Sequence, residues 1–347
     1  MATVADLILK NKHFLDQFTN GINKRLIGEL QKAQADILEE LTRGDLGIKR
    51  RAHLRAVAAE ATNILENAYG GFEDTILSGL SNAARQEYWS ISNALRSQAG
   101  MEEIAKNAPL QGIPTQALKN ILTDPVGGKL LKKWVDKQFA EADFQITRVL
   151  SQGMIQGQGI NKMVSELKKQ IEVSSRGAEV LIRTSVMDAS NKALEQAYKD
   201  HSKLILKYRA LATLDHRTCP VCVLHDGEEH KTFDSFTIRY PAHPSCRCII
   251  IPITKYEQDT TMRPYKIIDE DGETKYGKVS AKTSYSEWFN GQDAEFQKSF
   301  LGPVRYRMYR DGELELKQFV KSDKVLTLNQ LKERYDIDLG KFRKRNG

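Results

Sequence analysis

The stretch LDHRTCPVCVLHDGEEH (residues 214–230), followed by YPAHPSCRCIIIPIT (residues 240–254), contains all four cysteines of this 347-residue chain. A C-x-x-C unit stands in the first segment and an H-P-x-C-R-C unit in the second. Zinc takes four nitrogen or sulfur ligands in proteins, and a two-residue gap lets both thiolates of a C-x-x-C unit reach one ion. We therefore predict a zinc site, and its candidate ligands are Cys219, Cys222, His243, Cys246 and Cys248.

The candidate ligands outnumber the four positions around a zinc ion. If the backbone is already extended at Cys246, then Cys246 and Cys248 both reach the ion only where the chain curls around it. We expect Cys222 and His243 to bind, and one of Cys219, Cys246 and Cys248 to be spare. The alternative, that these cysteines are ordinary small buried side chains, does not explain why they cluster beside a histidine.

A site with this many thiolates is closed to water, so we expect structural zinc and no catalytic residue. A disulfide framework is disfavoured, because the first residues lack a secretory signal and cytoplasmic thiols stay reduced. Other polar residues lie beside the cysteines, and we expect them to form turn surface, with a turn at Asp226-Gly227. They are His216, His225, His230, Asp215, Asp226, Glu228 and Glu229.

The rest of the chain predicts an α+β fold. Apolar residues recur every three or four positions from Phe14 to Leu41, which marks one face of a long helix. Further helices are expected up to residue 203, including two that meet near Ser174 or Ser175, a plausible N-cap. Strands are expected around 203–215, 231–241 and 246–254, where β-branched and aromatic residues gather.

We divide the chain into four regions. Mixed helix and loop is expected at the C-terminal end, with a helix stop at Gly302-Pro303 and a helix capped by Thr327. The regions are a helical N-terminal region (1–114), a helical lead-in (115–203), a small zinc-stapled β-rich module (204–254) and a mixed C-terminal tail (255–347).

Composition sets limits on the function. The chain has 52 Lys+Arg and 45 Asp+Glu, a net charge of +7, which permits nonspecific contact with DNA without requiring it. Mean hydropathy is −0.49, and no apolar run approaches the ~20 residues of a membrane-spanning helix. We therefore expect no membrane span and synthesis in the cytoplasm.

The Cys/His segment resembles the phage head morphogenesis family, the minor head proteins similar to the F protein of phage Mu and gene product 7 of phage SPP1. The resemblance covers roughly 115–330 and includes an Arg183-Thr184 pair upstream. Landmarks of the family tail stand at Trp288, Leu301, Gly302, Arg305 and Gly312. The residues of the central pattern are Asp215, Arg217, Thr218, Cys219, Pro220, Cys222, Asp226, Gly227, Pro241, His243, Pro244, Cys246, Arg247, Cys248 and Pro252.

The resemblance implies a minor structural protein of a tailed-phage head, made in the bacterial host cytoplasm and located in the virion, in the capsid interior or at the portal vertex. It would act in head assembly or in DNA packaging and ejection. Its implied partner is the portal protein, with the major capsid or scaffolding protein as further candidates. Some relatives carry C-terminal toxin domains, for which this chain leaves no room, so we expect no enzyme activity.

The main alternative is a zinc-stabilised HNH-type nuclease. Such enzymes usually place paired C-x-x-C units around a histidine-containing hairpin. Here the second unit is H-P-x-C-R-C, and no His-His or Asp-His pair precedes a strand, which disfavours this alternative.

Overall fold

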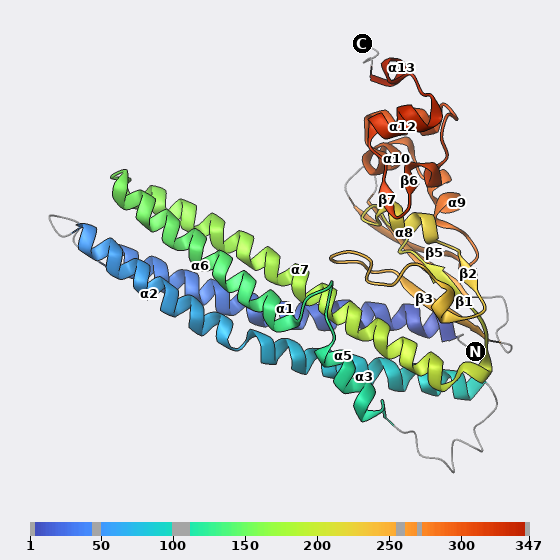
Figure 1. The fold of residues 1–347 in the computed structure, drawn as a ribbon, viewed down its shortest axis with the longest axis horizontal. Helices are drawn as coiled ribbons and strands as arrows, with labels where there is room; N and C mark the ends of the chain where they lie inside the picture. Colours follow the sequence, from blue (N-terminus) through green and yellow to red (C-terminus); the bar gives the residue numbers. More distant parts are fainter. Residues whose placement is uncertain (1–3, 44–49, 99–111, 255–260, 269–272, 344–347) are drawn as a thin grey trace.

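The structure is a computed structural model that describes residues 4–43, 50–98, 112–254, 261–268 and 273–343. Long helices form an elongated bundle, and small sheets followed by short helices stack at one end of it (Figure 1). The N-terminal end of the chain lies beside the strands, and the C-terminal end lies at the far end of the stack. The α+β class predicted from the sequence is confirmed.

The bundle forms where the apolar faces of its helices meet. Helix α1 packs along α7, α2 along α6, and α3 along α7. The predicted stripe of α1 is buried from Ile22 to Leu41, whereas Phe14 near its start is 49% exposed. Within the described ranges, no helix has both the length and the apolar character needed to cross a bilayer. The bundle helices are α1 (Val4–Thr42), α2 (Arg50–Gly70), α3 (Phe72–Gln98), α5 (Thr115–Thr123), α6 (Leu131–Ile155) and α7 (Ile160–Asp200).

Helix α7 corrects a predicted boundary. We expected a new helix to begin at Ser174 or Ser175, but one helix of 41 residues passes through both positions. The Ser174 hydroxyl donates to the carbonyl of Gln170 at 3.0 Å, so the serine bonds back into the helix instead of capping a new one. Buried Ile171 and Ala178 lie on either side of the pair, and packing keeps the helix continuous.

The strands nearest the bundle form a three-stranded antiparallel sheet in the order β2-β1-β3. Its strands are β1 (Ile205–Leu211), β2 (Glu229–His230) and β3 (Ile249–Thr254). Leu211 of β1 pairs with Ile249 of β3, and the Tyr198 hydroxyl of α7 donates to the Ile250 carbonyl at 2.9 Å. The strand predicted over 231–241 is wrong, because this segment contains a short 3-10 helix (Phe233–Ser235) and loop.

The C-terminal part packs around aromatic side chains. Tyr285, Trp288, Phe289 and Phe296 are buried and contact one another. The predicted cap at Thr327 is confirmed, since its hydroxyl accepts from the Gln330 amide. The elements are β4 (Met262–Ile268), β5 (Thr274–Ser280), α9 (Tyr285–Asn290), α10 (Ala294–Leu301), α11 (Pro303–Arg310), a 3-10 turn (Leu316–Phe319), β6 (Val320–Lys321), β7 (Lys324–Val325), α12 (Leu328–Tyr335) and α13 (Leu339–Arg343).

Gly302 and Pro303 end one helix and begin the next. Gly302 has φ +74°, a backbone conformation that favours glycine, and it closes α10. Pro303 then occupies the first turn of α11, where its missing N–H costs nothing. The predicted helix stop at Gly302-Pro303 therefore ends α10 and also begins α11.

A buried ion pair joins the three-stranded sheet to the C-terminal part. The Asp226 carboxylate accepts from the Ala212 amide at 2.7 Å, the Tyr285 amide at 2.5 Å, and Arg263 Nη2 at 2.9 Å. The side chains of Arg263 and Asp226 are 2% and 0% exposed. Asp226 was predicted to lie on turn surface; that is wrong, because its carboxylate serves as the common acceptor for three segments.

We predict that Arg263→Leu lowers the free energy of unfolding by about 3–5 kcal/mol, because it leaves the Asp226 carboxylate buried and uncompensated. The control Arg310→Leu removes an exposed pair with Asp311 and should cost under about 1 kcal/mol. Urea denaturation measures both. Equal effects of the two substitutions would contradict the role given to Arg263.

Candidate metal centre

The first ligand arm is a short helix, α8 (Pro220–His225), with a cysteine at its N-cap. The Cys219 sulfur accepts from the Cys222 amide at 3.3 Å. Pro220 begins the helix with a φ already suited to it. The C-P-x-C sequence therefore turns both sulfurs toward one point.

The second arm is the loop that leads into β3. The Cys246 amide donates to the His243 carbonyl at 3.1 Å, which closes a turn, and Ser245 between them has φ 57°. The Ser245 amide donates to the Thr184 hydroxyl of α7 at 3.0 Å. Thr184, one of the upstream residues of the resemblance, thus holds the histidine-bearing loop against the bundle.

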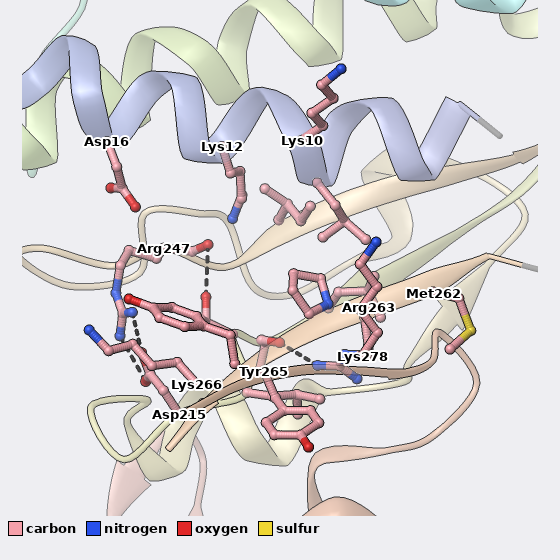
Figure 2. A pocket seen from close by; sticks show the side chains of 18 of the residues that line it. Lys10, Lys12, Asp16, Asp215, Arg247, Met262, Arg263, Tyr265, Lys266 and Lys278 are labelled. Atoms are coloured by element: carbon pink, nitrogen blue, oxygen red, sulfur yellow. Dashed lines mark hydrogen bonds and ion pairs between the residues drawn. The ribbon is translucent and has the colours of Figure 1, made fainter. Parts of the chain in front are cut away.

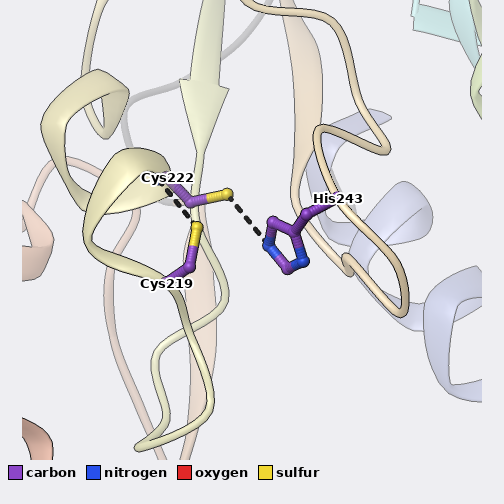
Figure 3. A group of neighbouring side chains, drawn as sticks. All are labelled: Cys219, Cys222 and His243. Carbon is purple, nitrogen blue, oxygen red and sulfur yellow. Dashed lines mark hydrogen bonds between the residues drawn. The ribbon is translucent and has the colours of Figure 1, made fainter. Parts of the chain in front are cut away.

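The two arms bring all five predicted ligands together. Cys219, Cys222 and His243 form one group, and Cys222, Cys246 and Cys248 form another, with ligand atoms within 4.8 Å of one another in each. Figure 3 shows the first group, with Cys222 pointing across to the imidazole of His243. Cys222 belongs to both groups, and β3 begins at Ile249, after both cysteines of the second arm.

The separations between the ligand atoms of Cys222, Cys246 and His243 fit a tetrahedral zinc ion. Zinc bonds of about 2.3 Å to sulfur and 2.0–2.1 Å to nitrogen put neighbouring ligand atoms about 3.8 Å (S to S) and 3.6 Å (S to N) apart. Cys222 Sγ lies 3.8 Å from Cys246 Sγ and 3.6 Å from His243 Nε2. The His243 Nδ1 lies 2.9 Å from the Pro244 carbonyl, so Nε2 is the nitrogen left for a metal.

Shared protons couple the side chains of the cluster. The hydrogen bond with Cys222 holds the pKa of Cys219 at about 4, and the same contact raises the pKa of Cys222. Hydrogen bonds to Cys219 and then Cys246 raise the pKa of His243 to about 10. A metal that binds here must displace the protons of Cys222 and His243, so its affinity increases with pH.

A lysine from α1 approaches the cluster from the bundle side. Burial lowers the pKa of Lys12 to about 8, while the nearby Cys248 and Cys246 act in the opposite direction. Lys12 gives no signal in the sequence, since it stands more than two hundred residues from the cysteines.

The neighbouring carboxylates are held by arginines. Asp215, also predicted to be turn surface, is 1% exposed and forms a two-pronged ion pair with Arg247, one contact being 2.9 Å. Asp226 is paired with Arg263 as described above. Both carboxylates therefore stabilise the fold around the cluster and are occupied as hydrogen-bond acceptors.

The nearby histidines form a separate hydrogen-bonded group. His225 Nδ1 lies 2.7 Å from Glu228 Oε2, and its Nε2 lies 2.6 Å from Asp323 Oδ1. His230 Nε2 lies 2.6 Å from the other oxygen of Glu228. His216 is exposed, as predicted. The hydrogen bond between His225 and Asp323 connects α8 to the turn between β6 and β7.

Comparison with known proteins places this geometry in a family. Residues 144–251, from α6 through β3, match the family described as phage Mu protein F like protein. This segment is similar to the phage Mu F-like family. The resemblance seen in the Cys/His pattern is therefore confirmed, and the match supports a phage head-related protein.

The chain is also similar to a curated protein of Enterococcus faecalis, named NAD(+)--arginine ADP-ribosyltransferase EFV. The two are 25% identical over 245 residues, which cover 68% of this chain and 48% of the relative. The chain thus spans about half the length of that relative. No solved structure matches it significantly.

We predict that Cys222→Ser abolishes zinc binding, because Cys222 belongs to both groups. Of the single serine variants at Cys219, Cys246 and Cys248, one should keep the metal, since zinc has four positions for five candidates. Elemental analysis of the purified chains gives zinc per chain, and limited proteolysis reports whether 204–254 loosens. A Cys222→Ser chain that keeps its zinc and its protease resistance would refute the assignment.

A second prediction concerns pH. Burial acts to lower the pKa of His225, but hydrogen bonds to Asp323 and Glu228 outweigh it and raise the pKa. Since only an imidazolium has protons on both nitrogens, this contact stabilises the fold below the unfolded pKa of about 6.5. The stabilisation is lost as the pH rises through the raised folded-state pKa.

Asp323→Asn should therefore cost about 1–2 kcal/mol at pH 5.5 and clearly less at pH 9. Thermal unfolding at the two pH values measures the difference. The control Asp234→Asn changes a side chain that is 83% exposed and should behave alike at both. An equal loss of stability for Asp323→Asn at pH 5.5 and at pH 9 would contradict the proposed charge on His225.

Proposed function

We propose that this phage Mu F-like protein is a minor structural component of a tailed-phage head, located in the virion and associated with the portal vertex. It would act in head assembly or in DNA packaging and ejection. The observation that carries the proposal is a thiolate-rich cluster, in a phage Mu F-like domain, fixed to one end of a long helical bundle. The portal protein is the proposed partner.

We further propose that the cluster holds structural zinc. Cysteine thiolates with histidine in tetrahedral spacing are the ligand set of structural zinc sites. The three-stranded sheet is small, and a structural zinc ion contributes about 10–16 kcal/mol of binding free energy to the folding of small zinc modules. The metal would therefore stabilise the three-stranded sheet that packs at the end of the bundle.

An enzymatic role has less support. Four Cys/His ligands leave no position for a reactive water at zinc, and Asp215 and Asp226 are occupied by arginines. The transferase activity in the name of the Enterococcus faecalis relative belongs to a protein about twice the matched length. We propose that the present chain does not catalyse a reaction.

The bundle offers a surface for a protein partner. Apolar side chains stand exposed on two of its helices: Phe144 and Ile155 of α6 are 59% and 77% exposed, and Val173 of α7 is 60% exposed. A helix of 41 residues is about 60 Å long, so α6 and α7 extend well away from the metal centre (Figure 1). Exposed large apolar side chains on such an arm suit contact with another protein.

Co-sedimentation with the portal protein of the same phage tests the proposal. We expect the wild-type chain to sediment with portal rings, and Phe144→Glu together with Ile155→Glu to reduce binding at least tenfold with zinc content unchanged. Glu141→Gln on the same helix is the control. Absence of the chain from purified virions would refute the structural role, and nicking of supercoiled plasmid with Mg²⁺ or Mn²⁺ would favour the HNH-type nuclease.

A further inference from the structure

A cavity of about 1200 Å³ lies between α1 and the strands. One wall is the first part of α1, and the opposite wall is formed by β4 and β5 (Figure 2). The end of β1 and the loop after it form the floor, beside Arg247 of the second ligand arm. Small-molecule sites in proteins usually measure about 300–1000 Å³, so this cavity has room for more than a single small ion.

The lining carries an excess of positive charge. It includes seven basic residues and three acidic ones. Two of the basic residues are neutralised, Arg247 by Asp215 and Arg263 by Asp226. Of the acidic residues, Asp215 is used in the first of these pairs, Asp6 accepts from the Met262 amide at 3.3 Å, and Asp16 also lines the cavity. The basic residues that remain are Lys10, Lys12, Arg217, Lys266 and Lys278.

Lys12 extends from α1 into the space between the walls (Figure 2). It points from α1 toward the strands, whereas Lys10 points away from them (Figure 2). Its side chain is half-buried, and among the residues that the structure describes it has no hydrogen bond or ion pair. A half-buried ammonium without a bonded anion is an electrostatic cost, which a bound anion would relieve.

Two lysines stand on the opposite wall. Lys266 of β4 lies 5.6 Å from the ring centre of Tyr276, and Lys278 of β5 is exposed. Neither forms an ion pair within the described part of the chain. The cations on this wall and Lys12 thus face the same space from two sides, which suits a ligand with several negative charges more than a single carboxylate.

Apolar and aromatic groups lie between the cations. Leu9, Met187 and Ile249 line the cavity together with Tyr265 and Tyr276. Tyr276 pairs with Lys266 across the hairpin, so its ring lies on the same face as that lysine, whereas the Tyr265 ring lies beside Trp288 on the other face. Such surfaces accept the flat or apolar body of an organic molecule. The combination differs from a plain patch of surface lysines, which would offer charge without a pocket for the body.

We propose that this cavity binds a polyphosphate group attached to an organic body, such as that of a nucleoside triphosphate. Lys12 contacts the phosphates from α1, Lys266 and Lys278 contact them from the strands, and the Tyr276 ring together with the apolar lining receives the body. The same phosphate chemistry could come from a free nucleotide or from consecutive phosphates of a nucleic-acid strand. The site is independent of the proposed portal association.

Isothermal titration calorimetry of the full zinc-loaded chain tests this site with three probes: ATP without Mg²⁺, pyrophosphate, and a twenty-nucleotide single-stranded DNA. We expect ATP to bind, and both Lys12→Met and the double variant Lys266→Gln, Lys278→Gln to weaken it at least tenfold. Lys24→Met changes an exposed lysine of α1 outside the cavity and should leave the affinity unchanged. Circular dichroism and zinc content confirm that each variant is folded.

The outcomes separate the sources of the phosphate. ATP binding that is weakened by both cavity variants, with weak or no DNA binding, supports a free nucleotide. Tight DNA binding weakened by the same variants, with ATP and pyrophosphate as weak competitors, supports a strand. Binding of none of the probes would overturn the proposal, as would affinities equal to wild type in both cavity variants, which have changes on opposite walls.

Discussion

Two segments of the chain meet at the sulfur of Cys222, which lies 3.6 Å from His243 Nε2 and 3.8 Å from Cys246 Sγ. The α8 arm and the loop before β3 are separated along the chain, and both also bury apolar side chains, Val223 in the arm and Phe236, Ile238 and Tyr240 in the loop. What brings them together is a set of short polar contacts between cysteines and histidine, completed by the proposed zinc. Around this point the Asp215–Arg247 and Asp226–Arg263 pairs join the strands, so polar cross-links add to the apolar core of this region.

The cysteine cluster could be predicted because it leaves a signal in composition: a chain that uses four cysteines places them all near one histidine. The bundle was predictable for a similar reason, since its apolar period extends over many turns of α1. The single helix across Ser174 was not predictable, because the two serines favour a cap locally and packing on both sides overrides that preference. Local sequence therefore predicts that a segment is helical more reliably than it predicts where the helix begins or ends.

The burial of Asp215 and Asp226 could not be predicted from the sequence. Asp215 and Asp226 stand in turn-forming sequence with other polar residues, and sequence alone assigns such residues to solvent. Their partners Arg247 and Arg263 are more than thirty residues further on, and nothing local reveals the pairing. The β4–β5 hairpin was not predicted for a related reason, since β4 contains Pro264 beside two basic residues, and β5 contains Gly277 and two lysines. Charged residues within a specific motif, such as Asp215 and Asp226, can therefore be buried and join segments of the fold.

The continuity of α7 has a mechanical consequence. Its first half lies in the bundle, and its second half carries Thr184, which holds the His243 loop, and Tyr198, which holds β3. Because no break separates the halves, the helix acts as a lever about 60 Å long. A load applied at the tip where α6 and α7 meet would be transmitted along one unbroken helix to the loop that carries His243 and to β3.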